Sequence, residues 1–356
     1  MPLLSVVVPC HNEEESLPVF AQALSSVARD MRKSQPSLRF ELVLIDDGST
    51  DNTLKVMRSL ERNAPEELEV RWTSFSRNFG KEAGIYAGLK MARGAFVTTM
   101  DADMQDPPTL LPEMYRILAE DKTYDCVGTR RSTRAGEPPI RSFFARCFYR
   151  LINRISDVEF VNGARDFRLM RRRMVDAVLS LGEYNRFSKG IFSWVGFETY
   201  WLEYENVERV AGRTNWSFWS LFKYSLDGIM GFSTAPLAFA SVLGAILSVV
   251  AFVFLIVVVV RALIHGDPVA GWPSTMSVIL LLGGINLLVL GIIGQYLAKT
   301  YLETKARPLF VVRASSDDVR NAADKRARSA RRPHPDKHPH SGARPLREDS
   351  AHETDE

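Results

Sequence analysis

The sequence contains few cysteines and little net charge. Its 356 residues include 3 cysteines and carry a formal net charge of +3. Because Cys10, Cys126 and Cys147 lack the spacing of a metal site, we expect reduced thiols in a cytosol-facing domain and no disulfide framework. So small a charge gives no reason to expect a nucleic-acid partner. The apolar start also lacks a basic segment and runs into the acidic residues 13–15, so we expect no signal peptide.

Two long stretches, residues 228–260 and 268–298, lack charged side chains altogether. A bilayer crossing requires about twenty apolar residues, and the segments 236–260 and 275–297 reach that length. A buried helix of a soluble protein is the alternative for one such segment, but two in succession favour membrane spans. Because the connection at 261–274 is short, we predict a transmembrane helical hairpin.

The charges around this hairpin predict its orientation. Arg261 and the neutral His265 are the only basic residues in the connection between the two spans. Lys223 precedes the first span, and Lys299, Lys305 and Arg307 follow the second. Because positive charge is enriched in cytoplasmic loops, we predict a multi-pass protein of the cell membrane with its N-terminal domain and its C-terminus in the cytoplasm.

Apolar runs alternate with helical patterns in the first 130 residues. We predict strands near residues 3–9, 39–46, 69–74, 95–101 and 124–128. Helical stretches are expected between them, near residues 15–33, 51–62, 80–92 and 109–120. This alternation predicts an α/β fold with a doubly wound, Rossmann-like nucleotide-binding sheet.

Acidic residues stand where two of these strands end. Asp101 and Asp103 close the strand at 95–101, and residues two apart on a strand point to the same side. Two adjacent anions repel unless a cation lies between them, and carboxylate oxygens suit Mg²⁺ or Mn²⁺. Asp46 and Asp47 close another strand, although a strand-to-helix turn alone also explains them. We therefore expect a ligand site at the carboxyl edge of the sheet.

Four motifs occur in a characteristic order. They are residues 9–13 (PCHNE), 46–49 (DDGS), 76–82 (SRNFGKE) and 101–108 (DADMQDPP). At these motifs the chain resembles the family 2 glycosyltransferases, which have a GT-A catalytic domain. It is most similar to their polyprenyl-phosphate branch, which includes bactoprenol glucosyltransferases and dolichol-phosphate mannosyltransferases. The resemblance covers roughly residues 3–312.

The resemblance implies a membrane-bound transferase that uses a nucleoside-diphosphate sugar and a polyprenyl phosphate such as undecaprenyl phosphate. We expect glucose from UDP-glucose to be transferred with inversion, for cell-envelope glycosylation. Mannose and N-acetylhexosamine donors are alternatives. A processive polysaccharide synthase is another, although it would need more membrane crossings and a carboxylate base. A non-catalytic membrane scaffold is a third, and the intact acidic clusters argue against it.

The resemblance also implies roles for individual residues. Asp101, Asp103 and Gln105 would hold magnesium or manganese, and Asp103, Arg130 and Asp166 form the expected catalytic set. The sugar nucleotide would contact Pro9, His11, Glu13, Asp46, Asp47, Arg77 and Lys81. A lipid phosphate is already anionic and needs no dedicated base, so cations should hold it in line. Besides Arg130, the candidates for contacting this phosphate or the donor are Arg141, Arg168, Arg209 and Arg213.

These observations divide the chain into five parts. We expect a cytosolic GT-A domain at 1–215, an interfacial amphipathic segment at 216–232 and the hairpin at 233–299. A juxtamembrane return segment at 300–312 and a disordered tail at 313–356 follow, because the tail is rich in charge and poor in apolar anchors. Whether the protein forms a homo-oligomer is left open.

Overall fold

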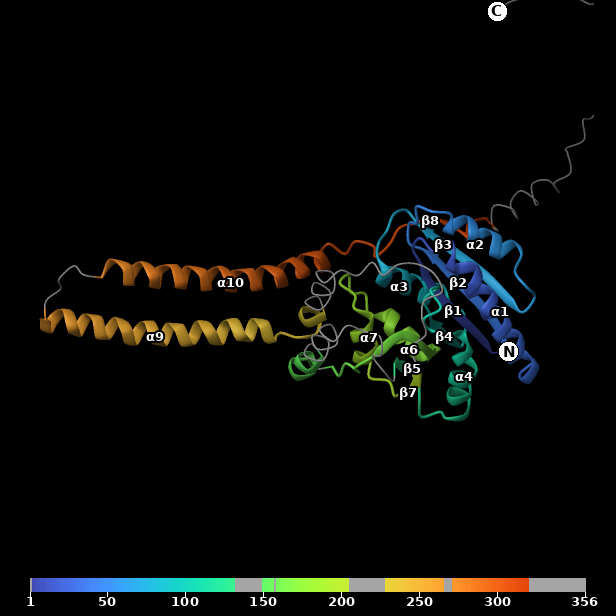
Figure 1. The fold of residues 1–356 in the computed structure, drawn as a ribbon, viewed down its shortest axis with the longest axis horizontal. Coiled ribbons are helices and arrows are strands. Elements are labelled where there is room, and N and C mark those ends of the chain that lie inside the picture. Colours follow the sequence, from blue (N-terminus) through green and yellow to red (C-terminus); the bar gives the residue numbers. More distant parts are fainter. Residues whose placement is uncertain (1, 132–148, 157, 205–227, 266–270, 320–356) are drawn as a thin grey trace, which may run out of the picture. The chain divides into compact units, whose positions relative to one another are not determined.

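The computed structural model describes residues 2–131, 149–156, 158–204, 228–265 and 271–319 (Figure 1). Residues up to Ser316 belong to one compact unit. Several predictions fall outside the described residues, namely the roles of Arg141, Arg209 and Arg213, most of the interfacial segment 216–232, and the tail from residue 320 onward.

The unit is built on an eight-stranded mixed sheet with the strand order β7-β5-β6-β4-β1-β2-β3-β8. The strands are β1 (Leu3–Cys10), β2 (Arg39–Asp46), β3 (Leu68–Phe75), β4 (Phe96–Thr99), β5 (Cys126–Arg131), β6 (Ala164–Arg171), β7 (Thr199–Tyr204) and β8 (Val312–Ser315). The central four, β3-β2-β1-β4, are parallel. In contrast, β6 runs antiparallel to β4 and β5, and β8 runs antiparallel to β3. The predicted α/β fold is confirmed.

Helices cover both faces of this sheet (Figure 1). One face carries α1 (Ser16–Ser34), α2 (Thr53–Arg62) and α4 (Leu111–Glu120), which follows a short 3₁₀ turn at Pro108–Leu110; the other carries α3 (Lys81–Met91), α6 (Arg172–Ser180) and α7 (Ser188–Trp194). Successive strand residues point to opposite faces, so Val6 packs towards α1 whereas Val7 packs towards α3. Both valines are fully buried. This double burial explains why the central strands read as continuous apolar runs.

Small residues bring α3 close to the sheet. A Cβ atom added to Gly88 would lie 2.1 Å from Cγ1 of Val7, and one added to Gly84 would lie 2.9 Å from Cβ of Pro9. Only glycine permits so close an approach. The packing fixes α3 against β1 and β2, and it places the first residue of α3, Lys81, at the carboxyl edge of the sheet.

The helical hairpin differs from the sheet in leaving its apolar side chains uncovered. Its helices are α9 (Ala235–His265) and α10 (Trp272–Thr304). Their segments Ala235–Phe254 and Leu281–Thr304 are long and apolar enough to cross a membrane, and almost none of these residues is buried. The hydroxyl of Tyr296 donates to the backbone oxygen of Ser233 at 2.6 Å. This hydrogen bond therefore joins α10 to the residues just before α9, at the end of the hairpin next to the sheet domain.

After α10 the chain returns to the sheet. Phe310 stacks on the buried Phe75 with ring centroids 4.8 Å apart, and β8 then pairs with β3. The backbone N–H of Trp72 donates to the hydroxyl of Ser316 at 3.2 Å, and Ser316 is fully buried. An ordered strand therefore begins at Val312 and crosses the expected start of the tail, because the open edge of β3 offers unpaired backbone groups.

Candidate active site at the carboxyl edge of the sheet

Three elements distant in sequence meet at Lys81. Its ammonium group lies 2.9 Å from Oδ2 of Asp101, after β4, and 2.8 Å from Oδ2 of Asp166, in β6. Burial by itself would raise the pKa of Asp166, but the charges of Lys81 and Lys189 outweigh it and hold the pKa far below its usual value. Asp166 is therefore an anion at any physiological pH. Lys81 in turn stays protonated: partial desolvation alone would lower its pKa, but its two carboxylate partners raise it, and its side chain is still 41% exposed.

The loop after Asp101 is held by specific contacts. Asp103 accepts a hydrogen bond from the backbone N–H of Gln105 at 3.1 Å, which closes a tight turn with Met104 in the left-handed region at φ 61°. The buried Asp106 accepts from Arg165 Nε at 3.0 Å and from the hydroxyl of Tyr204 at 2.6 Å. The loop is therefore tied to β6 and β7, and its carboxylates have a fixed setting.

Asp101 and Asp103 fit a divalent metal by their chemistry. Both supply hard carboxylate oxygens from one loop, and the ammonium of Lys81 lies 2.8 Å from Oδ1 of Asp101. Within the described part of the chain, no group of three or more His, Cys, Asp or Glu side chains gathers around a point. Two carboxylates leave coordination positions for phosphate oxygens of a substrate, which is the usual arrangement for magnesium. The side chain of Gln105 is next to them and accepts from Arg165 Nη2 at 3.4 Å.

The second acidic pair organises the neighbouring loop. Asp47 accepts the backbone N–H groups of Phe79 at 2.6 Å and Gly80 at 2.9 Å, and burial raises the pKa of Asp47. Asp46 is fully buried and accepts from the hydroxyl of Ser74 at 2.6 Å. Asp47 thus fixes the segment that leads into α3, so the acidic pair that ends β2 also positions Lys81.

The loop after β1 completes this edge. Glu13 accepts from the hydroxyl of Ser16, while its backbone N–H donates to Thr53 Oγ1 at 2.8 Å. His11 is exposed, and Pro9 lies in β1 opposite Ile45 of β2. The predicted nucleotide residues of β1 and β2 therefore line one edge. Nearby, the guanidinium of Arg77 lies 4.0 Å from the ring centroid of Phe79.

Two predicted phosphate-binding arginines have other partners. Arg130, in β5, donates to Oε1 of Glu203 in β7 at 2.5 Å, and its side chain is 40% exposed. Arg168 is almost fully buried, stands 4.0 Å over the ring of Phe192, and has a pKa lowered by burial. Arg130 is therefore accessible to a ligand that displaces Glu203, whereas Arg168 is packed into the α7 side of the sheet.

Arg313 is a residue of this edge to which no function was assigned from the sequence. Its Nη2 atom donates to the hydroxyl of Ser74 at 2.9 Å and lies 3.8 Å from Oδ2 of Asp46. Arg313 reaches this edge because β8 pairs with β3. The short apolar run at residues 309–312 (LFVV), after the second span, is the sequence signal that indicates a returning strand.

The sequence is similar to known glycosyltransferases over most of its length. Residues 5–179 match the family described as Glycosyl transferase family 2. The chain is 38% identical over 314 residues to the Putative glycosyltransferase CsbB of Bacillus subtilis, covering 88% of this chain and 92% of that protein. It is 37% identical over 310 residues to the Prophage bactoprenol glucosyl transferase homolog of Escherichia coli, covering 87% and 98%. Among solved structures, glucosyl-3-phosphoglycerate synthase from Mycobacterium tuberculosis in complex with Mn²⁺ and UDP-glucose is similar at a TM-score of 0.40 and 17% identity, covering 64% and 77%.

Proposed function

The chain belongs to glycosyl transferase family 2, and we propose that it transfers glucose from UDP-glucose to undecaprenyl phosphate, with inversion at the anomeric carbon. The observation that carries this proposal is the similarity over nearly the whole length, hairpin included, to proteins named bactoprenol glucosyl transferase. The acidic edge of the sheet supports a sugar-nucleotide site, and the exposed apolar hairpin supports a lipid acceptor. Mannose or N-acetylhexosamine on the same lipid is the alternative.

On the donor side, Asp101 and Asp103, with Gln105 beside them, would hold Mg²⁺ or Mn²⁺ against the diphosphate. Such an ion neutralises the charge that develops on the leaving group. Lys81 adds a protonated amine at the same place. The nucleoside would lie along the edge formed by Pro9, His11, Glu13, Asp46 and Asp47.

On the acceptor side, an oxygen of the lipid phosphate would attack the anomeric carbon. The new bond forms as the bond from that carbon to the diphosphate oxygen breaks, and the nucleoside diphosphate leaves with the electron pair. Because the attacking phosphate is already an anion, no general base is needed. Arg130 would exchange its partner Glu203 for the phosphate and hold it in line. Asp166 remains ionised and offers negative charge to the electron-poor sugar carbon or to a sugar hydroxyl.

We also propose that α9 and α10 cross the cell membrane and keep the sheet domain and the C-terminus in the cytoplasm. The uncovered apolar surface supports the membrane crossing. The cations after residue 298 support the orientation. In the domain scheme, 1–215 is catalytic, 216–232 lies at the interface, 233–299 spans the bilayer, and 300–312 leads back to the sheet. The tail begins only after β8, which ends at Ser315. A processive synthase, the rival enzyme, would need additional spans for a polymer channel.

The test is a transfer assay with purified protein in lipid nanodiscs containing undecaprenyl phosphate. Radiolabelled UDP-glucose, GDP-mannose and UDP-N-acetylglucosamine are supplied separately, with Mg²⁺ or Mn²⁺. We expect a labelled lipid with UDP-glucose whose sugar is released by mild acid. Labelling by another donor would change the sugar but keep the reaction. A water-soluble labelled polymer would favour the synthase, and an absence of labelled lipid with every donor would contradict the proposal.

A further inference from the structure

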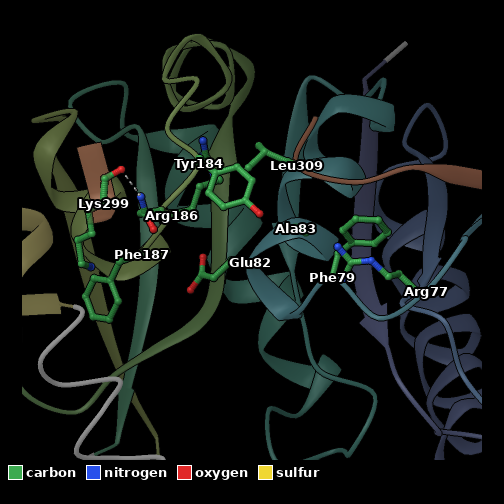
Figure 2. A pocket seen from close by; sticks show the side chains of 10 residues that line it. Arg77, Phe79, Glu82, Ala83, Tyr184, Arg186, Phe187, Lys299 and Leu309 are labelled. Atoms are coloured by element: carbon green, nitrogen blue, oxygen red, sulfur yellow. Dashed lines mark hydrogen bonds between the residues drawn. The ribbon is translucent and has the colours of Figure 1, made fainter. Parts of the chain in front are cut away.

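A cavity of about 330 Å³ lies between the start of α3 and the end of α10 (Figure 2). Its lining comes from three separate parts of the chain. Glu82 belongs to α3, Arg186 and Phe187 precede α7, and Lys299 belongs to α10, with Leu309 beyond it. Apart from Arg77 at one side, the residues in this lining have no role in the transfer reaction proposed above. The volume is at the lower end of those that hold small ligands.

The lining favours an anion. Arg77, Arg186 and Lys299 contribute positive charges to it, and Glu82 is its carboxylate. Burial raises the pKa of Glu82, so this carboxylate resists ionisation more than an exposed one would. Glu82 is also used internally, because it accepts the backbone N–H of Ser188 at 2.9 Å. The cations therefore dominate the cavity, and phosphate oxygens are well suited to guanidinium and ammonium donors.

The cavity is preformed by contacts between the sheet domain and α10. The backbone N–H groups of Tyr184 and Asn185 each donate to Glu303 of α10 at 3.0 Å. The side-chain amide of Asn185 donates to the backbone oxygen of Lys299 at 3.4 Å. Arg186 is braced by the ring of Tyr86, with its guanidinium 4.5 Å from the centroid. A ligand would therefore find its partners already in place, which lowers the cost of ordering them on binding.

The cavity also stands where the apolar part of α10 ends. No charged residue occurs from position 268 to 298, and Lys299 is the first one after this stretch. A bilayer around α10 would therefore end close to Lys299, whose amine can extend to the lipid head groups. Phe187 and Leu309 give the same lining an apolar part. An anionic head joined to an apolar tail matches this combination.

We propose that this cavity binds the phosphate-bearing head group of a membrane lipid whose tail lies along α10. The inference rests on the proposed function, because it requires the hairpin to be in a bilayer. Two lipids offer this chemistry: the polyprenyl phosphate acceptor and an anionic phospholipid such as phosphatidylglycerol. Glu82 directly follows Lys81, which contacts Asp101 and Asp166. A lipid held here would therefore touch the same helix that carries the lysine of the active site.

The test measures lipid binding to the full-length protein by native mass spectrometry after delipidation. Undecaprenyl phosphate, phosphatidylglycerol, zwitterionic phosphatidylcholine and uncharged diacylglycerol are titrated separately. Lys299→Glu should weaken binding of the anionic lipid roughly ten- to a hundredfold, since it removes a charged hydrogen bond and adds repulsion. Lys299→Arg should recover most of the affinity. Leu309→Trp should weaken binding by filling the cavity without changing its charge.

Lys305→Glu is the matched control. It makes the same charge change at the same end of α10, but the amine of Lys305 lies 4.2 Å from the ring centroid of Tyr301 and does not line the cavity. A loss confined to undecaprenyl phosphate would identify the acceptor as the ligand, a loss confined to phosphatidylglycerol would identify a phospholipid, and a loss of both would identify the shared head group. Unchanged binding in Lys299→Glu and Leu309→Trp, or an equal loss in Lys305→Glu, would overturn the inference.

Sugar transfer by the wild-type protein, measured in the same preparations, separates this inference from the proposed function. Lipid binding that depends on Lys299, without any transfer of sugar to lipid, would contradict the proposed function and leave the cavity assignment standing. Transfer of glucose to undecaprenyl phosphate by the wild type, with lipid binding unchanged in Lys299→Glu and Leu309→Trp, would support the proposed function and contradict the cavity assignment.

Discussion

Apolar side chains are buried in the sheet and exposed in the hairpin. Leu42 in β2 and Val6 in β1 are fully buried by helices of their own chain, whereas Leu287 in α10 is 72% exposed and Val249 in α9 is 64% exposed. Removing apolar surface from water contributes about 25 cal/mol per Å². The apolar surface of the hairpin is not buried by its own chain, and a lipid bilayer would remove it from water instead. The comparison shows that one chain divides its apolar residues between its own core and the membrane.

Charged groups follow the opposite distribution. They gather at the carboxyl edge of the sheet, where Lys81, Asp101 and Asp166 compensate one another, and in α10 they begin only at Lys299. The charged sheet edge suits a water-soluble nucleotide, and the apolar hairpin suits a membrane lipid. The chemistry should therefore depend on the sheet edge, and access to the acceptor should depend on the junction with the hairpin. The following changes test that division, in order of expected effect.

Asp103→Asn should have the largest effect on transfer and none on membrane insertion. Losing a carboxylate proposed to hold the metal that neutralises the leaving group should lower the rate about a hundred- to a thousandfold, while the turn bond from Gln105 can be kept by the amide oxygen. Removal of divalent metal with EDTA should act in the same way. The surface variant Asp30→Asn, which loses only its contact with Lys33, is the control. Full activity in chelator, with metal verified to be absent, would contradict the metal assignment.

Arg130→Ala should affect the acceptor and not the donor. Loss of a charged hydrogen bond to the lipid phosphate should reduce transfer roughly ten- to a hundredfold, with UDP-glucose affinity, measured by calorimetry, nearly unchanged. Arg130→Lys should recover only part of the rate, because an ammonium lacks the planar fork of a guanidinium. Weaker donor binding with an unchanged dependence on lipid concentration would instead place Arg130 on the nucleotide side.

Arg313→Ala should affect the donor and not the acceptor. Arg313 stands beside Ser74 and Asp46 at the proposed nucleotide site. We therefore expect the KM for UDP-glucose to rise by up to about tenfold, the equivalent of one charged hydrogen bond at its lower limit, with little change in kcat. Arg58→Ala, which loses a stacking contact with Trp72, controls for removal of a surface arginine. An unchanged KM would show that β8 is only a structural strand.

Lys81→Met should produce a small stability change with a defined pH dependence. The pKa of Asp166 is lowered in the folded state, so its contribution to stability is present above the unfolded pKa and is lost as the pH falls through the folded pKa. The pKa of Lys81 is raised in the folded state, so its contribution to stability is lost only as the pH rises above the unfolded pKa. The difference in unfolding free energy from the wild type should be about 1 kcal/mol between roughly pH 4 and pH 10. Denaturant unfolding in detergent should show it shrinking below pH 4. A difference that grows on acidification would contradict the pairing.

Local pattern was sufficient to predict much of this molecule. The strands β1 to β5 were predicted from apolar runs, two of which end in acidic residues, and both hairpin helices were predicted because charge is missing over a bilayer's thickness. β6, β7 and β8 were not, because their pairing is tertiary: β6 contains Arg165, Arg168 and Arg171, whose polarity hides a strand, and β8 is formed by only four residues.

The site shows the same limit. The motifs predicted a metal-binding Asp101 and a nucleotide-binding Lys81, but no local pattern reports that Lys81 joins Asp101 to Asp166, which is 85 residues from Lys81. Nor does it report that Tyr204 reaches across 98 residues to hold Asp106. Side chains that recognise one another only after the sheet has formed leave no periodic signal in the sequence. The assigned roles of the individual site residues remain predictions.

Cysteine accessibility in intact cells tests most directly the claim that the membrane covers the hairpin and leaves the sheet domain inside. With Cys147 replaced by serine and the buried Cys10 and Cys126 kept, Gly271→Cys probes the connection before α10, and Lys122→Cys probes an exposed loop of the sheet domain. A membrane-impermeant thiol reagent should label Cys at position 271 from outside and label position 122 only after lysis. Labelling of position 122 in intact cells, with position 271 protected, would contradict the orientation, and equal labelling of both in the soluble fraction would contradict the membrane hairpin itself.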